Sequence, residues 1–413
     1  MRGYVTRDCQ LAQALGEKCL EMFHSACGFY PRRLLSAGNL AEKWLINKGL
    51  AYPKFASIPY NIQEFSYSGF VAARIEMLRR GFIGRMYVYD LNNAYPAIIK
   101  TLPDLMDGEW VSGSTTIENK AAIGFFKINA DVPDTKHVAP FPFKGNHKLY
   151  FPTGWFGTYA TIEELRACER KSYYKIIDSH QFIPNSNYHP YAALIDEFDA
   201  KRRELKAKGD PLYIPFKVIP NSLYGKSVEI IRNGWKRKIG NMCCPVIGVH
   251  ITGTCRAQQY RFIREHNIEK ETVASATDSV FTTRNLGINS DKLGEYALKA
   301  ECEDGYFVQN GIYRVNGQWK SRGYGKIKGI AIDEKKIVEH NGKLCAEVEF
   351  AKSLGLKEAI KQNRIAEVGK ILDALKYVNF NADRKRCWLG ELERLDDGRS
   401  NYSIPWSFNV FTV

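Results

Sequence analysis

Two aspartates occupy positions from which a carboxylate could bind a metal ion. Asp90 ends the apolar run MYVYD (86–90), so a strand would hold its carboxylate rigidly at the strand end. That placement suits a divalent-cation ligand, but it equally suits a helix N-cap that accepts free backbone amides. Asp278 in ATDS (276–279) would lie at the tip of a hairpin, where Asp is also an ordinary turn residue. Each acid alone leaves both interpretations open.

A third segment, KVIPNSLYG (217–225), combines a cation, an amide and an aromatic ring. Lys217, Asn221 and Tyr224 have the spacing that places side chains on one face of a helix. A lysine suits a phosphate, and an amide and a ring suit a base or sugar, so this face could bind a nucleotide. An ordinary amphipathic helix is the alternative, and Pro220 predicts a kink because it removes one helical hydrogen bond.

Helices and strands that must position these side chains are interspersed without a regular βαβ alternation, which predicts an α+β fold. Thr161 and Glu164 have the spacing of a capping box, which predicts a helix start. The pattern of apolar residues predicts helices over 4–27, 161–170, 190–209, 245–264 and 356–376 and one starting near 95, strands over 86–90 and within 122–151, a strand–turn–strand over 272–283, and a connector over 46–65.

Composition limits the functional class. The 413 residues carry a formal net charge of +14 with 52 aromatic residues, which favours a polyanion partner, nucleic acid first; a basic enzyme with another substrate is the alternative. Neither a transmembrane span nor a signal peptide is predicted, so we expect no membrane partner and a cytoplasmic protein, in the host cytoplasm if the source is a virus. The ten cysteines lack C-x-x-C spacing and are expected to be reduced thiols.

The order of the three segments resembles the family B DNA polymerases. DLNNAYP (90–96) is similar to motif A, D-x-x-S-L-Y-P, and 217–225 is similar to motif B, K-x-x-x-N-S-x-Y-G. ATDS is similar to motif C, D-T-D-S. The likeness extends over 67–76, 149–165 and 325–329, and it is nearest to the viral and protein-primed branch.

The resemblance implies a right-handed polymerase fold of palm, fingers and thumb. It predicts these units: 1–30, a remnant of an exonuclease domain; 31–80, a connector to the palm; 81–187, the first part of the palm; 188–235, the fingers; 236–330, the second part of the palm; 331–413, the thumb.

The resemblance also implies template-directed DNA synthesis with two Mg²⁺ ions, for which Mn²⁺ would substitute, on primer–template DNA and deoxynucleoside triphosphates. The implied metal ligands are Asp90, Asp278 and the carbonyl of Leu91, and Lys217 is the implied catalytic lysine. The implied nucleotide contacts are Tyr95, Lys206, Lys217, Asn221, Tyr224 and one of Arg202 and Arg203. The implied DNA contacts are Tyr67, Gly69, Arg256, Lys326 and Lys328; for the three basic residues, an ordinary surface lysine or arginine is the alternative.

Three departures from the family pattern carry expectations of their own. Ala276 replaces the first acid of motif C, which predicts weaker metal binding or a slower rate. YVTRD (4–8) resembles only the last exonuclease motif, through Tyr4 and Asp8, so we expect no proofreading in this chain. Only 57 residues separate Asn221 from Asp278, which disfavours a strand-displacement insertion and protein priming.

Two other functions remain open at this point. One is a catalytically degenerate polymerase fold that acts as a DNA-binding subunit, which Ala276 and Pro220 favour. The other is one half of a split polymerase, which would need a separate exonuclease-bearing chain or a priming protein. A reverse transcriptase is disfavoured, because that class expects two adjacent acids where Thr277 and Asp278 stand.

Overall fold

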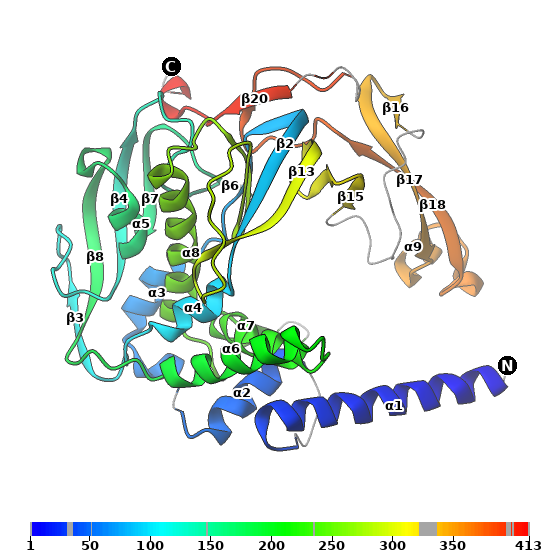
Figure 1. Ribbon diagram of the computed structural model, residues 1–413, viewed down its shortest axis with the longest axis horizontal. Helices are drawn as coiled ribbons and strands as arrows, with labels where there is room; N and C mark the ends of the chain where they lie inside the picture. Colours follow the sequence, from blue (N-terminus) through cyan, green and yellow to red (C-terminus); the bar gives the residue numbers. More distant parts are fainter. Residues whose placement is uncertain are drawn as a thin grey trace.

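The computed structural model describes residues 2–30, 36–50, 52–145, 148–233, 236–321, 337–393, 398 and 400–411. In this part of the chain, a nine-stranded antiparallel sheet forms the centre of the molecule (Figure 1). Its strands pair in the order β1-β11-β12-β2-β13-β14-β15, while β20 joins β2 and β19 joins β20. The bounds are β1 Ile75–Met77, β2 Arg79–Leu91, β11 Thr272–Ala276, β12 Ser279–Thr282, β13 Tyr296–Gln309, β14 Ile312–Val315, β15 Gln318–Ser321, β19 Cys387–Trp388 and β20 Ser400–Ile404.

Residues 86–89 of strand β2 are buried on both faces of the sheet, which explains this unbroken run of large apolar residues. Met86 and Val88 pack with one cluster, whereas Tyr87 and Tyr89 pack on the opposite face against helix α8 (Pro245–Glu265). A strand buried on both sides reads as a continuous apolar run rather than as an alternation. The predicted strand over 86–90 is therefore confirmed as the end of a longer strand, and the predicted helix over 245–264 is confirmed as α8.

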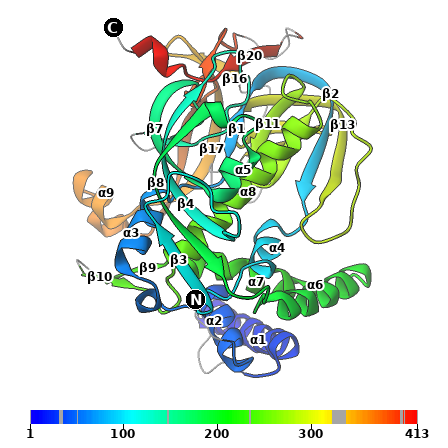
Figure 2. The same ribbon diagram turned by 90° about the vertical axis from the view of Figure 1, so that its left-hand side faces the viewer.

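Helix α8 lies between the central sheet and a second, four-stranded sheet (Figure 2). The second sheet has the order β3-β8-β4-β7, with β3 Gly108–Ser112, β4 Ile123–Val132, β7 Gly154–Thr161 and β8 Tyr174–Pro184. The predicted capping box is present at the start of α5 (Ile162–Ala167), which ends three residues before the predicted boundary. A Cβ atom on Gly253 of α8 would lie 2.3 Å from Thr161, so only glycine permits this approach of α8 to α5.

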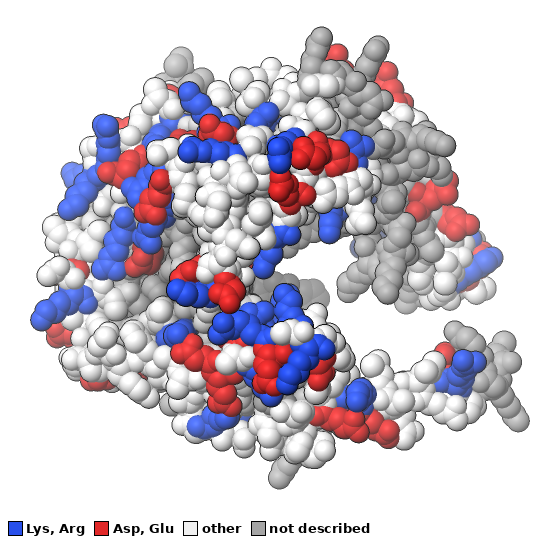
Figure 3. Space-filling model, in the orientation of Figure 1, with Lys and Arg blue, Asp and Glu red and all other residues white. Residues whose placement is uncertain are grey.

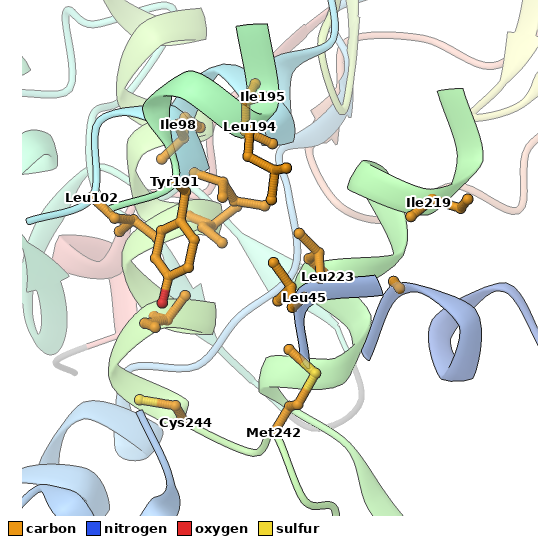
Figure 4. Close-up of a cluster of buried hydrophobic side chains, with 14 of the residues drawn as sticks. Leu45, Ile98, Leu102, Tyr191, Leu194, Ile195, Ile219, Leu223, Met242 and Cys244 are labelled. Carbon is orange, nitrogen blue, oxygen red and sulfur yellow. The ribbon is translucent and has the colours of Figure 1, made fainter. Parts of the chain in front are cut away.

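A second group of helices packs beneath the end of β2. Its members are α2 Ala37–Asn47, α3 Tyr60–Ser68, α4 Ala94–Lys100, α6 Ala192–Ala207 and α7 Tyr213–Ser227. Figure 4 shows their shared core, in which side chains from α2, α4, α6 and α7 meet, among them Leu45, Ile98, Leu194, Ile195 and Leu223. This core fixes α6 and α7 relative to α4, the helix that follows Asp90 directly.

Helix α1 (Arg2–Cys27) confirms the predicted N-terminal helix and extends away from the rest of the described chain (Figure 1). Its Leu11 and Leu15 side chains are 61% and 66% exposed. The period-four apolar pattern therefore predicted the helix correctly, although most of its length does not pack against the sheet. Within the described residues, no helix has the length and apolar character needed to cross a membrane.

The C-terminal part differs from its prediction. The expected helix over 356–376 is a short α9 (Leu356–Lys361), after which Asn363 adopts a left-handed φ of 54° that ends helical geometry. The remainder forms β18 (Ile371–Asn379), which pairs with β17 (Lys343–Ser353) beside β16 (Ile337–His340).

The expected connector over 46–65 is also partly wrong, because it contains most of α3. Two small ribbons complete the strands: β5 Phe143–Lys144 with β6 Leu149–Tyr150, and β9 Ile230–Asn233 with β10 Lys236–Ile239.

Three fully buried charges attach the C-terminal segment to the central sheet. Glu76 accepts hydrogen bonds from Arg74 at 2.7 Å and from Arg386 at 3.2 Å, and all three side chains are 1% exposed. Burial alone would raise the pKa of Glu76, but the two guanidinium groups outweigh it and hold the pKa below its ordinary value. The backbone carbonyl of Arg74 accepts the N–H of Thr277 at 2.9 Å, so this cluster borders the Thr277–Asp278 turn.

We expect acid to destabilise the protein partly through His250 on α8. Burial lowers the pKa of this imidazole from 6.5 to about 4, so it is neutral in the folded protein and takes up a proton on unfolding in mildly acidic solution. The stability contribution is full above pH 6.5 and is lost as pH falls towards 4, by up to about 3 kcal/mol. The urea midpoint of the wild type should therefore fall between pH 6.5 and 4.5 more steeply than that of His250→Leu. Parallel curves would contradict this assignment.

Candidate active site

The tight turn between β11 and β12 positions Asp278. Thr277 has a left-handed φ of 64°, and the N–H of Asp278 donates to the carbonyl of Ala276 at 2.8 Å. The carbonyl of Asp278 accepts the N–H of Leu91 at 3.0 Å, which joins this turn to the end of β2. The predicted strand–turn–strand is thus confirmed.

Asp90 lies beside that turn because β12 pairs with β2. Ser279 is the register partner of Asp90, and its hydroxyl donates to Asp90 Oδ1 at 2.6 Å. Asp90 itself is half-buried at the end of the strand, where the chain leaves the sheet for α4. Two carboxylates that lie 188 residues apart in sequence are therefore held by hydrogen-bonded strand ends.

A cavity of about 370 Å³ brings together most of the residues predicted from the motifs. It lies between the ends of β2 and β12 and the helices α6 and α7. The predicted residues that line it are Asp90, Leu91, Tyr95, Arg202, Lys206, Lys217, Asn221 and Asp278. Residues that sequence reasoning did not single out also line it, namely Asn92, Asn93, Ala94, Thr277 and Lys299.

The donor set in this cavity fits Mg²⁺. Asp90 and Asp278 supply carboxylate oxygens, and Leu91 is positioned beside both by its hydrogen bond to Asp278. Magnesium is commonly bound by one or two carboxylates together with water and substrate phosphates, rather than by a full cage of protein ligands. The same cavity contains cations from α6 and α7 that could bind those phosphates.

Asp199 on α6 organises the cationic side of the cavity. Its carboxylate accepts hydrogen bonds from Arg202 at 2.8 Å and from Asn93 at 3.1 Å, and Arg203 lies 3.0 Å away. The Asp199 side chain is only 6% exposed, so its pair with the largely buried Arg202 is shielded from solvent. Asn93 has a left-handed φ of 48° and follows β2, so its hydrogen bond to Asp199 connects the end of β2 to α6. The spacing of Asp199 to Arg202 and Arg203 could have revealed the pairing, but not the contact with Asn93.

Two tyrosine rings are in tilted contact at the cavity wall. The rings of Tyr95 and Tyr224 have centroids 4.6 Å apart at an angle of 46°. Burial raises the pKa of both phenols, so both stay neutral at physiological pH. Tyr95 lines the cavity and Tyr224 packs behind it, which places the two predicted aromatic residues in successive layers.

Cys255 on α8 contacts the turn between β11 and β12. Its Sγ donates to the carbonyl of Thr277 at 3.4 Å. Burial, together with the nearby Asp278, raises the pKa of this thiol to about 12, so it stays protonated and can donate. Nothing in the local sequence indicated this role, because the contact depends on how α8 packs beneath the sheet.

Arg256 occupies a different environment from the DNA-facing surface that we expected. It is 2% exposed, its Nε donates to Glu164 at 2.7 Å, and its Nη1 donates to the carbonyls of Val71 and Ala72. A buried guanidinium with these partners cannot reach a duplex phosphate in this conformation. We therefore assign Arg256 a structural role between α8, α5 and the segment before β1.

Position 276, where motif C of the family has its first acid, lines a separate cavity. Ala276, together with Ala274, lines a neighbouring cavity of about 630 Å³ whose walls include Phe307, Tyr313 and Trp319. Position 276 therefore does not line the cavity that contains Asp90 and Asp278.

The remaining predicted residues lie elsewhere. Tyr67 is 43% exposed and stacks on Phe70, while Gly69 caps the end of α3; neither lines the catalytic cavity. Of the two candidate arginines, Arg202 lines the cavity and Arg203, which is 48% exposed, does not. Asp8 is exposed on α1. The Tyr4 side chain, Lys326 and Lys328 lie outside the described residues.

Charged side chains of both signs border a hollow in the molecule. In Figure 3 the visible face is hollow between the sheet above and α6 and α7 below, and Lys and Arg side chains border the hollow alongside acidic ones. Because the catalytic cavity lies between the same elements, this hollow is a natural approach for a polyanion.

Comparison with known proteins identifies the class to which the chain belongs, the DNA polymerases. A family model described as "DNA polymerase type B, organellar and viral" matches residues 4–295. The match covers more than half of the chain, which therefore belongs to the type B DNA polymerases of organelles and viruses.

Individual relatives agree with this assignment. A DNA polymerase of the Acidianus bottle-shaped virus (isolate Italy/Pozzuoli) is 23% identical over 374 residues, which cover 81% of this chain and 54% of the viral protein. The chain thus spans about half the length of that relative. Phi29 DNA polymerase in complex with primer–template DNA and incoming nucleotide has a similar fold, with a TM-score of 0.59, 14% identity and coverage of 84% of this chain and 68% of the phi29 chain. Phi29 polymerase with single-stranded DNA gives a TM-score of 0.54 at 15% identity, covering 88% and 62%.

Proposed function

We propose that this chain is a DNA-directed DNA polymerase that adds deoxynucleotides to the 3′ end of a primer on a DNA template. The observation that carries the proposal is the single cavity in which Asp90 and Asp278 face Arg202, Lys206 and Lys217. Carboxylates for metal ions on one side and cations for phosphates on the other are the two requirements of nucleotidyl transfer. Family membership and the phi29 relative, which was solved with primer–template DNA and nucleotide, support this proposal.

The side chains of the cavity divide the chemistry among them. Bound Mg²⁺ would activate the primer hydroxyl and offset the negative charge that develops at the α-phosphate. Asp90 and Asp278 would hold the ions, with the Leu91 carbonyl as a further oxygen. Arg202 and Lys206 would bind the outer phosphates, and Lys217 would neutralise the leaving pyrophosphate and supply a proton to it.

We assign the units of a right-handed polymerase to the chain as follows. Residues 81–187 and 236–330 form the palm, which contains the catalytic strand ends. Residues 188–235 form the fingers, which contain α6 and α7, and 331–413 form the thumb. Residues 31–80 are the connector, and 1–30 correspond to the end of an exonuclease domain. We propose synthesis and not proofreading as the activity of the described cavity, since Asp8 lies on α1 and does not line it.

Primer extension tests the proposal directly. The purified chain is incubated with a primed DNA template, deoxynucleoside triphosphates and Mg²⁺, with Mn²⁺ in a parallel reaction. Template-dependent extension is expected. Absence of extension with both ions, while the chain still binds the primed template, would contradict the proposal.

Tyr95→Val is expected to relax discrimination against ribonucleotides. Tyr95 lines the cavity and packs against Tyr224, so the proposed function places its ring beneath the sugar of the incoming nucleotide, where it would clash with a 2′-hydroxyl. The ratio of kcat/KM for deoxynucleotide over ribonucleotide should fall by roughly tenfold or more. Tyr95→Phe keeps the ring and should retain the ratio. An unchanged ratio in Tyr95→Val would remove the steric role.

A further inference from the structure

Lys299 projects from an irregularity in the central sheet. Along β13, Leu298 pairs with Tyr89 and Ala300 pairs with Val88, although Tyr89 and Val88 are adjacent in β2. Lys299 is therefore the extra residue of a β-bulge. Bulges leave one residue outside the regular ladder and redirect its side chain, and they occur frequently next to active sites.

The bulge directs the ammonium group of Lys299 to the catalytic cavity. Lys299 lines that cavity with Asp90 and Asp278, and its neighbour Ala297 is the register partner of Asp90. Its Nζ donates to Oδ1 of Asn92 at 3.2 Å. The amide nitrogen of Asn92 in turn donates to the carbonyl of Ser290 at 2.7 Å, which fixes the amide with its oxygen towards the lysine. The Lys299 ammonium group is thus held by Asn92, which follows Asp90 by two residues.

Lys299 differs from the cations on α6 and α7 in the element that carries it and in its hydrogen-bond partner. Lys206, Lys217 and Arg202 come from α6 and α7, and Arg202 is already paired with Asp199 at 2.8 Å. Lys299 comes from the sheet and bonds to a neutral amide, so its hydrogen bond leaves the positive charge uncompensated by that partner. A lysine ammonium has three donors, of which the contact with Asn92 uses one.

We propose that Lys299 binds the β- and γ-phosphates of the incoming deoxynucleoside triphosphate, and the pyrophosphate product, from the sheet side of the cavity. This inference rests on the proposed function and adds a phosphate ligand opposite the helix-borne cations. A phosphate oxygen of the primer or template backbone would offer the same chemistry. The nucleotide is favoured because Lys299 shares one cavity with Lys206 and Lys217 as well as with the two carboxylates.

Kinetics of matched variants test this role. Lys299→Met should raise KM for the deoxynucleotide and the inhibition constant for inorganic pyrophosphate by about tenfold each, because one charge-assisted hydrogen bond is lost. The value of kcat and the Kd for primed template should change by less than about twofold, and Lys299→Arg should recover most of the lost affinity. Lys292→Met is the control: that side chain is 74% exposed and lies 4.0 Å from Glu295, and its loss should leave both constants unchanged.

Three results would overturn the assignment. An unchanged KM in Lys299→Met excludes nucleotide binding, and a weaker Kd for DNA in its place identifies a backbone phosphate as the ligand. Equal losses in Lys299→Met and Lys292→Met, with Lys299→Arg like the wild type, indicate a general charge effect. Calorimetric binding of Mg²⁺–pyrophosphate to the wild type and Lys299→Met separates this inference from the proposed function. If the wild type fails to extend primers yet binds pyrophosphate about tenfold more tightly than Lys299→Met, the polymerase proposal fails while the phosphate site stands.

Discussion

Asp90→Asn and Asp278→Asn should each reduce primer extension by about 10³-fold or more. Each change removes one negative charge from the two carboxylates that line the cavity, while a side chain of nearly the same shape remains. Metal ions contribute several kcal/mol of transition-state stabilisation in such sites, and each 1.4 kcal/mol corresponds to a factor of ten in rate. Initial rates of extension on a primed template measure the loss.

The variants also distinguish the polymerase from its non-enzymatic alternative. Asp291→Asn, an exposed aspartate outside the cavity, should extend primers like the wild type. Melting temperature and DNA affinity should be close to wild type in all three variants. Full extension by both Asp90→Asn and Asp278→Asn would show that other residues carry the reaction. A wild type that binds primed DNA without extending it would instead indicate a polymerase fold used for DNA binding.

Arg256→Met should destabilise the fold by about 3–5 kcal/mol. The substitution leaves the Glu164 carboxylate, whose side chain is 1% exposed, without its cationic partner at 2.7 Å. Removing one member of a buried ion pair costs far more than the pair contributes, because the remaining charge stays desolvated. The carbonyls of Val71 and Ala72 also lose their donor. The urea midpoint and the melting temperature should both fall clearly.

A double variant and a surface control sharpen this prediction. Arg256→Met with Glu164→Gln removes both charges and should recover part of the stability, which a double-mutant cycle measures. Arg261→Met, on the same helix, breaks a 3.6 Å pair between partly exposed side chains and should cost less than about 1 kcal/mol. If Arg256→Met instead unfolds like the wild type and weakens DNA binding, the originally expected DNA contact would be restored.

Most of the residues that line the cavity could be predicted because each motif is local. Asp90 follows an apolar run that forms a strand, and Asp278 lies in a turn whose flanking residues form a hairpin. Lys217 and Asn221 share a helix face, and α7 continues through Pro220 as a single element. Their convergence was supplied by the family resemblance, because nothing in the separate segments indicates that β12 pairs with β2.

Other features depend on contacts between distant segments, which no local pattern reports. Arg256 resembled a surface cation, but its partner Glu164 lies 92 residues away. Nothing in the sequence around Lys299 predicts a position at the cavity, and only the bulge in the pairing of β13 with β2 brings the side chain there. The helix predicted over 356–376 was wrong beyond Lys361, because pairing with β17 outweighs the helix propensity of residues 371–376.

The pairings of β2 with β12 and with β20 determine when the two ends of this strand can be completed during synthesis. Asp90 leaves the ribosome 188 residues before Asp278, so β2 lacks its neighbour β12 while that interval is synthesised. The other end of β2 gains its partner later still, because residues 79–81 pair with residues 400–402. The nascent chain therefore exposes the apolar residues 86–89 of β2 without their partner strand throughout this interval. Slow elongation in the interval between these strands should accordingly promote aggregation, and co-expressed chaperones that shield apolar segments should raise the soluble yield.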